Sequence, residues 1–152
     1  MDGRLVESSG STLRHNRTRD YLTAKLLTYV DERSLGMIVS VQPFDFRGDV
    51  LCPDVSFVSS GRVRAGYDNR RVLPFVPDLV VEIASEDDLL EATMQKLMHY
   101  RTCGTKEVWM LVAGNAFVFS EREEIILDEN DDFRSDLIPG FSIRLKDLFD
   151  RA

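Results

Sequence analysis

The sequence predicts a mixed α/β domain, and its length, composition and periodicity lead to that prediction. A chain of 152 residues can bury one hydrophobic core, so we expect residues 1–152 to form a single domain. Hydrophobic residues make up 43% of the chain and charged residues 30%, as in folded globular proteins. Segments of helical and strand periodicity follow in the order helix, three strands, helix, strand and antiparallel C-terminal strands.

The first expected element is a helix over residues 13–32. Its apolar residues recur at the spacing of one helical face, at Leu22, Leu26, Tyr29 and Val30. The hydroxyl-rich segment 8–12 precedes it and is suited to an N-cap, and Gly36 ends the pattern. Residues 37–46 and 50–58 are rich in β-branched and aromatic residues, which predicts a hairpin of two strands.

The second half of the chain begins with a strand over residues 78–84, which is apolar apart from two carboxylates and therefore typical of a central strand covered on both faces. A hydroxyl and three acidic residues at 85–88 then predict the start of a helix that runs to about Cys103 and ends at Gly104. The remaining segments are predicted to be a buried strand at 106–113, strands at 117–119 and 125–127, an acidic loop at 128–132 and an apolar C-terminal segment at 141–149.

Charge and cysteine content limit the classes of function. The net charge is −7, but residues 1–71 carry 11 basic and 9 acidic side chains, so the acidity lies in the C-terminal half. A nucleic-acid role would need a local basic face. The densest candidate is a loop with Arg62, Arg64, Arg70 and Arg71, for which a merely solvated loop is the alternative. Two cysteines cannot form a disulfide framework, and the chain has no apolar run of membrane length and no signal peptide, so we expect a cytoplasmic protein.

Glu82 is the most informative residue. An ionised carboxylate inside the apolar run 79–84 is costly to bury unless a cationic group or a metal ion offsets its charge. Asp54 repeats the pattern on the preceding strand, so the two acids could converge on one Mg²⁺ or Mn²⁺, because Mg²⁺ is usually bound by one or two carboxylates with water and phosphate oxygens. A structural ion pair or a neutral, hydrogen-bonded acid is the alternative for Glu82.

Lys96 is the expected basic partner of these acids. It lies in a helical row made of Leu89, Ala92, Lys96, Tyr100 and Cys103. Its ammonium would either point at the two carboxylates or extend outward into solvent. The stripe that faces the main core is expected to be the neighbouring row, Leu90, Met94, Leu97 and Met98. His15 and His99 have no spacing to another His or Cys that is typical of a metal site.

Two acids on neighbouring strands with a basic group beside them resemble the core of the PD-(D/E)XK nuclease superfamily. In its short motifs the chain resembles the Uma2 family of restriction-endonuclease-like proteins, through residues 2–6, 52–58, 77–85, Lys96 with Tyr100, 104–109 and 137–141. This resemblance implies a restriction-endonuclease-like fold in which Asp54 and Glu82 bind the metal, Lys96 completes the catalytic set, and His15 and Tyr100 line the site. Ala84 stands where the superfamily carries its lysine, and the resemblance implies that Lys96 on the following helix takes that role.

The implied activity is that of a Mg²⁺- or Mn²⁺-dependent endonuclease that hydrolyses phosphodiester bonds in DNA. In such a reaction the cation polarises a phosphoryl oxygen and lowers the pKa of the attacking water, while Lys96 would stabilise the transition-state charge or orient that water. Cutting both strands would favour a two-fold homodimer. Two alternatives stay open. One is a catalytically weak or inactive nuclease-fold protein that acts as an interaction module, which suits the acidic charge, and the other is a hydrolase of another phosphate ester.

Overall fold

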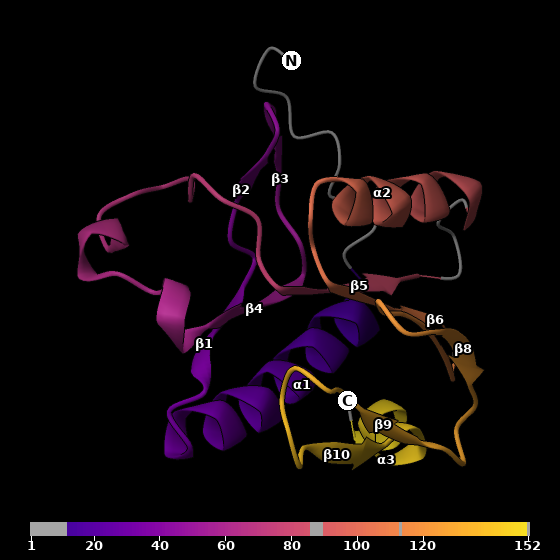
Figure 1. Cartoon of the computed structure of the whole chain (residues 1–152). Helices are drawn as coiled ribbons and strands as arrows, with labels where there is room; N and C mark the ends of the chain where they lie inside the picture. The colour runs from indigo at the N-terminus through magenta and orange to yellow at the C-terminus, as the bar shows by residue number, and fades with distance from the viewer. Residues whose placement is uncertain (1–11, 86–89, 113, 152) are drawn as a thin grey trace.

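The computed structural model describes residues 12–85, 90–112 and 114–151, and their helices lie on both faces of a central sheet (Figure 1). The described strands form a six-stranded sheet in the order β1-β4-β5-β6-β7-β8 and two smaller two-stranded sheets, β2-β3 and β9-β10. Only β5 and β6 run parallel among the neighbours in the large sheet, so the predicted mixed α/β class with a mixed central sheet is confirmed.

The helices and strands have the following bounds. They are α1 (Leu13–Glu32), β1 (Gly36–Ser40), β2 (Phe44–Phe46), β3 (Asp49–Leu51), β4 (Val55–Ser59), the short 3-10 turns η2 (Ser60–Arg62) and η3 (Ala65–Tyr67), β5 (Leu79–Ala84), α2 (Leu90–Thr102), β6 (Glu107–Val112), β7 (Asn115–Phe119), β8 (Glu124–Leu127), β9 (Asp132–Arg134), β10 (Ser142–Arg144) and α3 (Leu145–Arg151).

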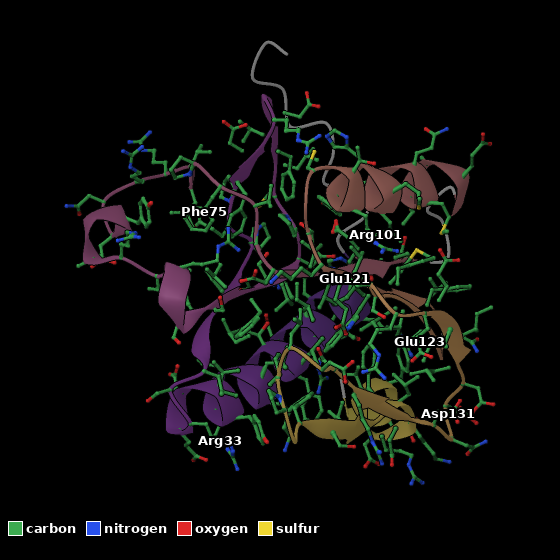
Figure 2. The ribbon with its side chains drawn as sticks, in the orientation of Figure 1. Arg33, Phe75, Arg101, Glu121, Glu123 and Asp131 are labelled. Carbon is green, nitrogen blue, oxygen red and sulfur yellow. The ribbon has the colours of Figure 1, made fainter. Side chains whose placement is uncertain are left out.

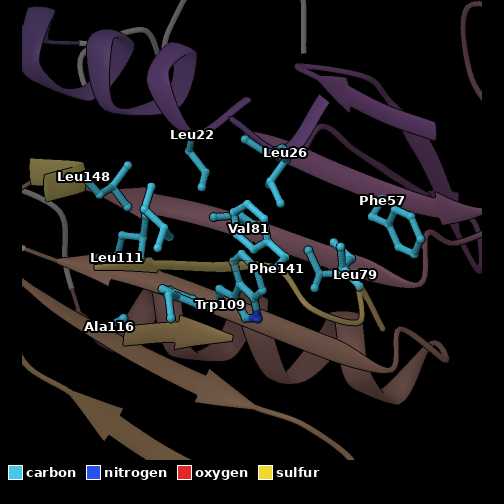
Figure 3. Close-up of a cluster of buried hydrophobic side chains, with 14 of the residues drawn as sticks. Leu22, Leu26, Phe57, Leu79, Val81, Trp109, Leu111, Ala116, Phe141 and Leu148 are labelled. Carbon is cyan, nitrogen blue, oxygen red and sulfur yellow. The ribbon is translucent and has the colours of Figure 1, made fainter. Parts of the chain in front are cut away.

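Helix α1 covers one face of the sheet, together with α3 and the β9-β10 hairpin. The Thr12 hydroxyl accepts a hydrogen bond from the His15 backbone N–H at 3.1 Å, which caps the first turn as the sequence predicted. Leu22 and Leu26 are fully buried and point toward the apolar face of β5 and β6 (Figure 3). Each such side chain stabilises the fold by about 1.5–3 kcal/mol. Gly36 then opens β1, where a Cβ atom would lie 2.2 Å from the Val58 carbonyl oxygen, so no larger residue fits there.

The hairpin predicted from residue 37 to 58 forms, but each of its two strands is broken in the middle. The pairs β1-β4 and β2-β3 keep the antiparallel pairing of one long hairpin. Pro43 and Pro53 interrupt the ladder because proline has no backbone N–H to donate. Between β1 and β2, Val41 adopts a φ of 51°, a left-handed conformation that is rare for a β-branched residue. The break bends β2 and β3 away from the large sheet (Figure 1).

Helix α2 lies on the opposite face, and its predicted orientation was partly wrong. Met98 was expected in the core stripe but is 49% exposed, whereas Tyr100 in the neighbouring row is completely buried. The face of α2 that meets the sheet runs through Lys96, Leu97, Tyr100 and Cys103. The side chains of Tyr100 and Cys103 fill the space above β5 and β6. The predicted start of this helix, at 86–88, lies outside the described residues, as does Leu89.

The apolar C-terminal segment predicted at 141–149 divides into strand β10 and helix α3. Strands β9 and β10 do pair antiparallel, and Asp132, predicted to lie in the acidic loop, begins β9. Helix α3, however, was not predicted. Leu145 and Leu148 are both buried, three residues apart on one helical face. An apolar segment of nine residues carries too little periodicity to separate a strand from a short helix. None of the described helices is long and apolar enough to cross a membrane.

Candidate functional site

The pairing of β4 with β5 places Asp54 beside Glu82. Val55 lies opposite Val81 in this antiparallel ladder, and one further step of the same register puts Asp54 opposite Glu82. Side chains that lie directly opposite in such a pair share one face of the sheet. The Asp54 Oδ2 atom also accepts a hydrogen bond from the backbone N–H of Ile83 at 2.8 Å. The two acids predicted to act together are therefore brought together by the fold.

Lys96 and Tyr100 on α2 both point at the Glu82 carboxylate. The Lys96 Nζ atom lies 2.7 Å from Glu82 Oε1, and the Tyr100 hydroxyl donates to the same oxygen at 3.3 Å. The Glu82 side chain is only 8% exposed, while that of Lys96 is 40% exposed. Lys96 thus contacts the buried acid and still reaches solvent, where a substrate could approach it. Of the two orientations left open by the sequence, the ammonium adopts the one toward the carboxylate.

The second oxygen of Glu82 is the unusual feature of the site. Oε2 is buried and has no hydrogen-bond partner in the described part of the chain. Burial raises the pKa of Glu82, the charge of Lys96 lowers it, and the charge of Asp54 raises it again, with a net rise to about 7. Glu82, whose Oε2 has no hydrogen-bond partner among the described residues, and the neighbouring Asp54 together form a donor set that suits a hard cation with oxygen ligands.

This donor set supplies only part of a coordination shell. No group of three or more His, Cys, Asp and Glu side chains that could hold a metal ion occurs in residues 12–85, 90–112 and 114–151. A cation bound by Asp54 and Glu82 would take its remaining ligands from water and substrate oxygens, as Mg²⁺ commonly does.

His15 extends the site from the first turn of α1. Its Nε2 atom lies 3.3 Å from Asp54 Oδ2, and its side chain is 11% exposed. The hydrogen bond to Asp54 is the main cause that raises the pKa of His15, and burial opposes it. His15 and Ile83 also line an open cavity of about 600 Å³ beside the C-terminal end of β5. The structure therefore places His15 next to the acids, as expected for a residue that lines the site, whereas His99 contacts Asp49 at 3.2 Å instead.

Two residues near the acids were missed by the sequence reasoning. The pKa of the Cys52 thiol is raised, mainly by burial and then by the negative charges of Glu82 and Asp54. This side chain therefore lies close enough to the two acids to sense their charge. Its position two residues before Asp54 was the available signal. Val41 donates its backbone N–H to the Asp54 carbonyl oxygen at 3.0 Å. Nothing in the residue type of Val41 indicates this contact, because it depends only on the backbone.

Comparison with known proteins identifies the family and the fold of the chain. Residues 1–146 match the sequence profile of the Uma2 family, described as "Putative restriction endonuclease". The chain belongs to the Uma2 family. This membership confirms the family that the short motifs indicated. No protein of curated function matches the sequence.

Solved structures share the fold of this Uma2 chain. A crystal structure described as "a putative nuclease belonging to DUF820 from Anabaena variabilis ATCC 29413" superposes with a TM-score of 0.84 at 16% sequence identity, over 99% of this chain and 88% of that one. The two chains therefore share one fold, in agreement with the predicted mixed α/β class with a mixed central sheet. A cryo-EM structure of a "DrdV-DNA complex" is similar over 74% of this chain and 10% of that one, with a TM-score of 0.49 and 18% identity.

Proposed function

We propose that this Uma2 chain is a metal-dependent endonuclease that hydrolyses phosphodiester bonds in DNA. The observation that carries the proposal is the buried Oε2 of Glu82, which has no hydrogen-bond partner among the described residues and lies beside a second carboxylate, while the other oxygen contacts Lys96. A buried acceptor without a partner costs about 1–3 kcal/mol. A cation shared with Asp54 would remove that cost. Membership of a nuclease family supports a phosphodiester as the substrate.

Each side chain of the site has a role in this mechanism. Asp54 and Glu82 would hold Mg²⁺ or Mn²⁺, which when bound would polarise a phosphoryl oxygen and lower the pKa of a water molecule. Lys96 favours the ionised form of Glu82 and presents its exposed ammonium to the negative charge that would develop on the phosphate. His15 and the Ile83 N–H fix the orientation of Asp54, and Tyr100 fixes that of Glu82. The proposal includes a two-fold homodimer, because the two strands of DNA present two symmetry-related phosphates.

A second candidate function is an interaction module that keeps the nuclease scaffold without its activity. Two observations favour it. The net charge of −7 opposes nucleic-acid binding in general, and the Lys96–Glu82 ion pair already balances the charge of the buried acid without a metal ion. In this case the site would be a structural ion pair.

Calorimetric titration with Mn²⁺ separates the two candidates. We expect the wild type to bind Mn²⁺ and to cleave plasmid DNA only in its presence, and we expect Glu82→Gln and Asp54→Asn to lose both properties. Glu124→Gln, which changes an exposed acid on β8, is the matched control and should behave as the wild type. Absence of Mn²⁺ binding by the folded wild type, or binding that neither site variant weakens, would favour the module.

A further inference from the structure

The loop between β4 and β5 carries three side chains in one row, those of Arg64, Tyr67 and Arg70. The Tyr67 backbone N–H donates to the Arg64 carbonyl at 3.1 Å, and the Arg70 N–H donates to the Tyr67 carbonyl at 3.0 Å. Two successive bonds of this i to i+3 type give three residues per turn, which aligns every third side chain. All three residues line a shallow groove of about 170 Å³, which Gln42 and Phe75 also border.

The arginines of this row have no acidic partner among the described residues. Arg64, Arg70 and the adjacent Arg71 are exposed, and none of them makes an ion pair within the described ranges of the chain. Arg62 differs, because it pairs with Asp78 Oδ1 at 2.8 Å and donates to the Val76 carbonyl at 2.6 Å. The four-arginine patch indicated by the sequence is thus reduced to three available cations. Asp68 is the acidic residue that lines the groove.

Aromatic rings give the groove a rigid floor. The Tyr67 and Phe75 rings pack with their centroids 5.2 Å apart, and Phe75 packs on the buried Phe44 at 6.0 Å. Figure 2 shows Phe75 in the space between this loop and β2. A half-buried tyrosine between two unpaired guanidinium groups is suited to a chain that alternates phosphates with flat rings, since phosphates pair with arginine and bases or sugars pack on aromatic faces.

The groove is held close to the candidate active site by two contacts of neighbouring residues. The Gln42 side chain donates to the Arg71 carbonyl oxygen at 2.9 Å. The preceding residue, Val41, donates to the Asp54 carbonyl oxygen at 3.0 Å. In addition, Leu73 forms a bridge with Phe44 of β2, which folds the loop back toward this end of the sheet. A strand bound in the groove would therefore pass near Asp54.

We infer that this groove binds the phosphate backbone of the DNA substrate beside the cleavage site, with Arg64 and Arg70 contacting phosphates and Tyr67 contacting the intervening nucleoside. The inference rests on the proposed function and names the surface that recognises its substrate. It also explains how an acidic protein could bind a polyanion, because one loop gathers three arginines that make no ion pair within the described ranges, against the single acid Asp68 that lines the groove.

DNA binding without divalent metal tests the inference separately from catalysis. Fluorescence anisotropy with a labelled DNA duplex in EDTA would compare the wild type with Arg64→Ala/Arg70→Ala. The matched control is Lys25→Ala/Lys146→Ala, which removes two exposed charges from α1 and α3 on the other face of the sheet. We expect the groove variant to bind at least about tenfold more weakly, and the slope of log affinity against log salt to fall by roughly two, one for each phosphate that an arginine no longer neutralises. The control should change neither.

The outcomes separate failure of the groove from failure of the proposed nuclease. The inference would be overturned if the groove variant and the control lost the same amount of DNA affinity, or if Arg64→Ala/Arg70→Ala left the DNA affinity unchanged. Neither result would contradict Mn²⁺ binding or cleavage by the wild type. Absence of any DNA binding by the wild type, or preference for an RNA duplex over DNA, would also overturn it. Loss of affinity in the groove variant alone, with Mn²⁺ binding intact, would support it.

Discussion

Two buried glutamates on adjacent central strands show how differently one fold can treat the same side chain. Glu82 on β5 and Glu107 on β6 are 6% and 4% exposed, and burial raises the pKa of both. Glu107 is completely satisfied by neutral donors, because Trp109 Nε1 donates to one oxygen at 2.6 Å and Ser135 Oγ to the other at 3.0 Å. Glu82 has one oxygen in contact with a lysine, and its other oxygen has no partner in the part of the chain that the structure describes.

The two carboxylates differ in whether both of their oxygens have hydrogen-bond donors. Both oxygens of Glu107 have donors, so the side chain ties β6 to the segment after β9 and needs no further ligand. Glu82 keeps an unused acceptor and faces a second acid, Asp54. Buried polar groups are nearly always satisfied in native proteins, and the exceptions are commonly places where a ligand or ion binds. Glu107 is therefore satisfied within the fold, whereas Glu82 is the acid to which the proposed function assigns chemistry.

Removal of the lysine should have the largest effect on activity. In Lys96→Met the Glu82 carboxylate loses its cationic partner, and the developing phosphate charge loses a donor. We expect cleavage to fall about 10²–10³-fold while the protein stays folded, since the Lys96 side chain is 40% exposed. Single-turnover rates at saturating Mn²⁺ would measure this, with circular dichroism as the check on folding. Wild-type rates in Lys96→Met would contradict a catalytic role for the lysine.

Loss of the structural glutamate should act on stability instead. Glu107→Ala leaves the Trp109 N–H and the Ser135 hydroxyl buried without an acceptor, so we expect the free energy of unfolding to fall by about 2–4 kcal/mol. Urea denaturation would measure the change. Mn²⁺ affinity at a temperature where the variant is folded should equal that of the wild type. A matched loss of Mn²⁺ binding would show that the two glutamates do not differ in the proposed way.

The pH dependence should distinguish the two acids further. The pKa of Glu82 is raised from 4.5 to about 7. Between these values Glu82 is protonated in the folded state and ionised in the unfolded state. The contribution of this group to the free energy of unfolding is therefore fully present below pH 4.5 and is lost as the pH rises through 7. Glu82→Gln should remove this contribution to the slope of the free energy of unfolding against pH. A single titrating group can contribute at most about 1.4 kcal/mol per pH unit. Because a cation needs the ionised acid, Mn²⁺ affinity should rise over the same range. An affinity independent of pH would exclude Glu82 as a ligand.

Much of this fold could be predicted from the sequence, and the failures have physical reasons. Helix α1 and the central strand β5 carry strong periodicity or an unbroken apolar run, and both lie where they were predicted. For helix α2 the wrong face was predicted to be buried. Met98 and Tyr100 lie in two neighbouring rows that both follow the helical period, and only packing against the sheet decides which row is buried. The acids and the lysine of the candidate site could be predicted because each is a charged side chain in an otherwise apolar strand or helical row. The Val41 and Ile83 backbone contacts to Asp54 have no such signal, since any residue type supplies an N–H.

The smallest expected effect concerns the hydroxyl of Tyr100. Tyr100→Phe removes the hydrogen bond to Glu82 Oε1 but keeps the ring that packs on Phe46, with centroids 4.8 Å apart. The lost bond should cost about 0.5–1.5 kcal/mol of stability. Since an O–H donor favours the ionised acid, its loss should also raise the pKa of Glu82 further and move the rise of Mn²⁺ affinity to higher pH. The same calorimetric titrations would measure that shift. A stability loss with an unshifted pH profile would mean that Tyr100 only fills space and does not orient the carboxylate for its cation.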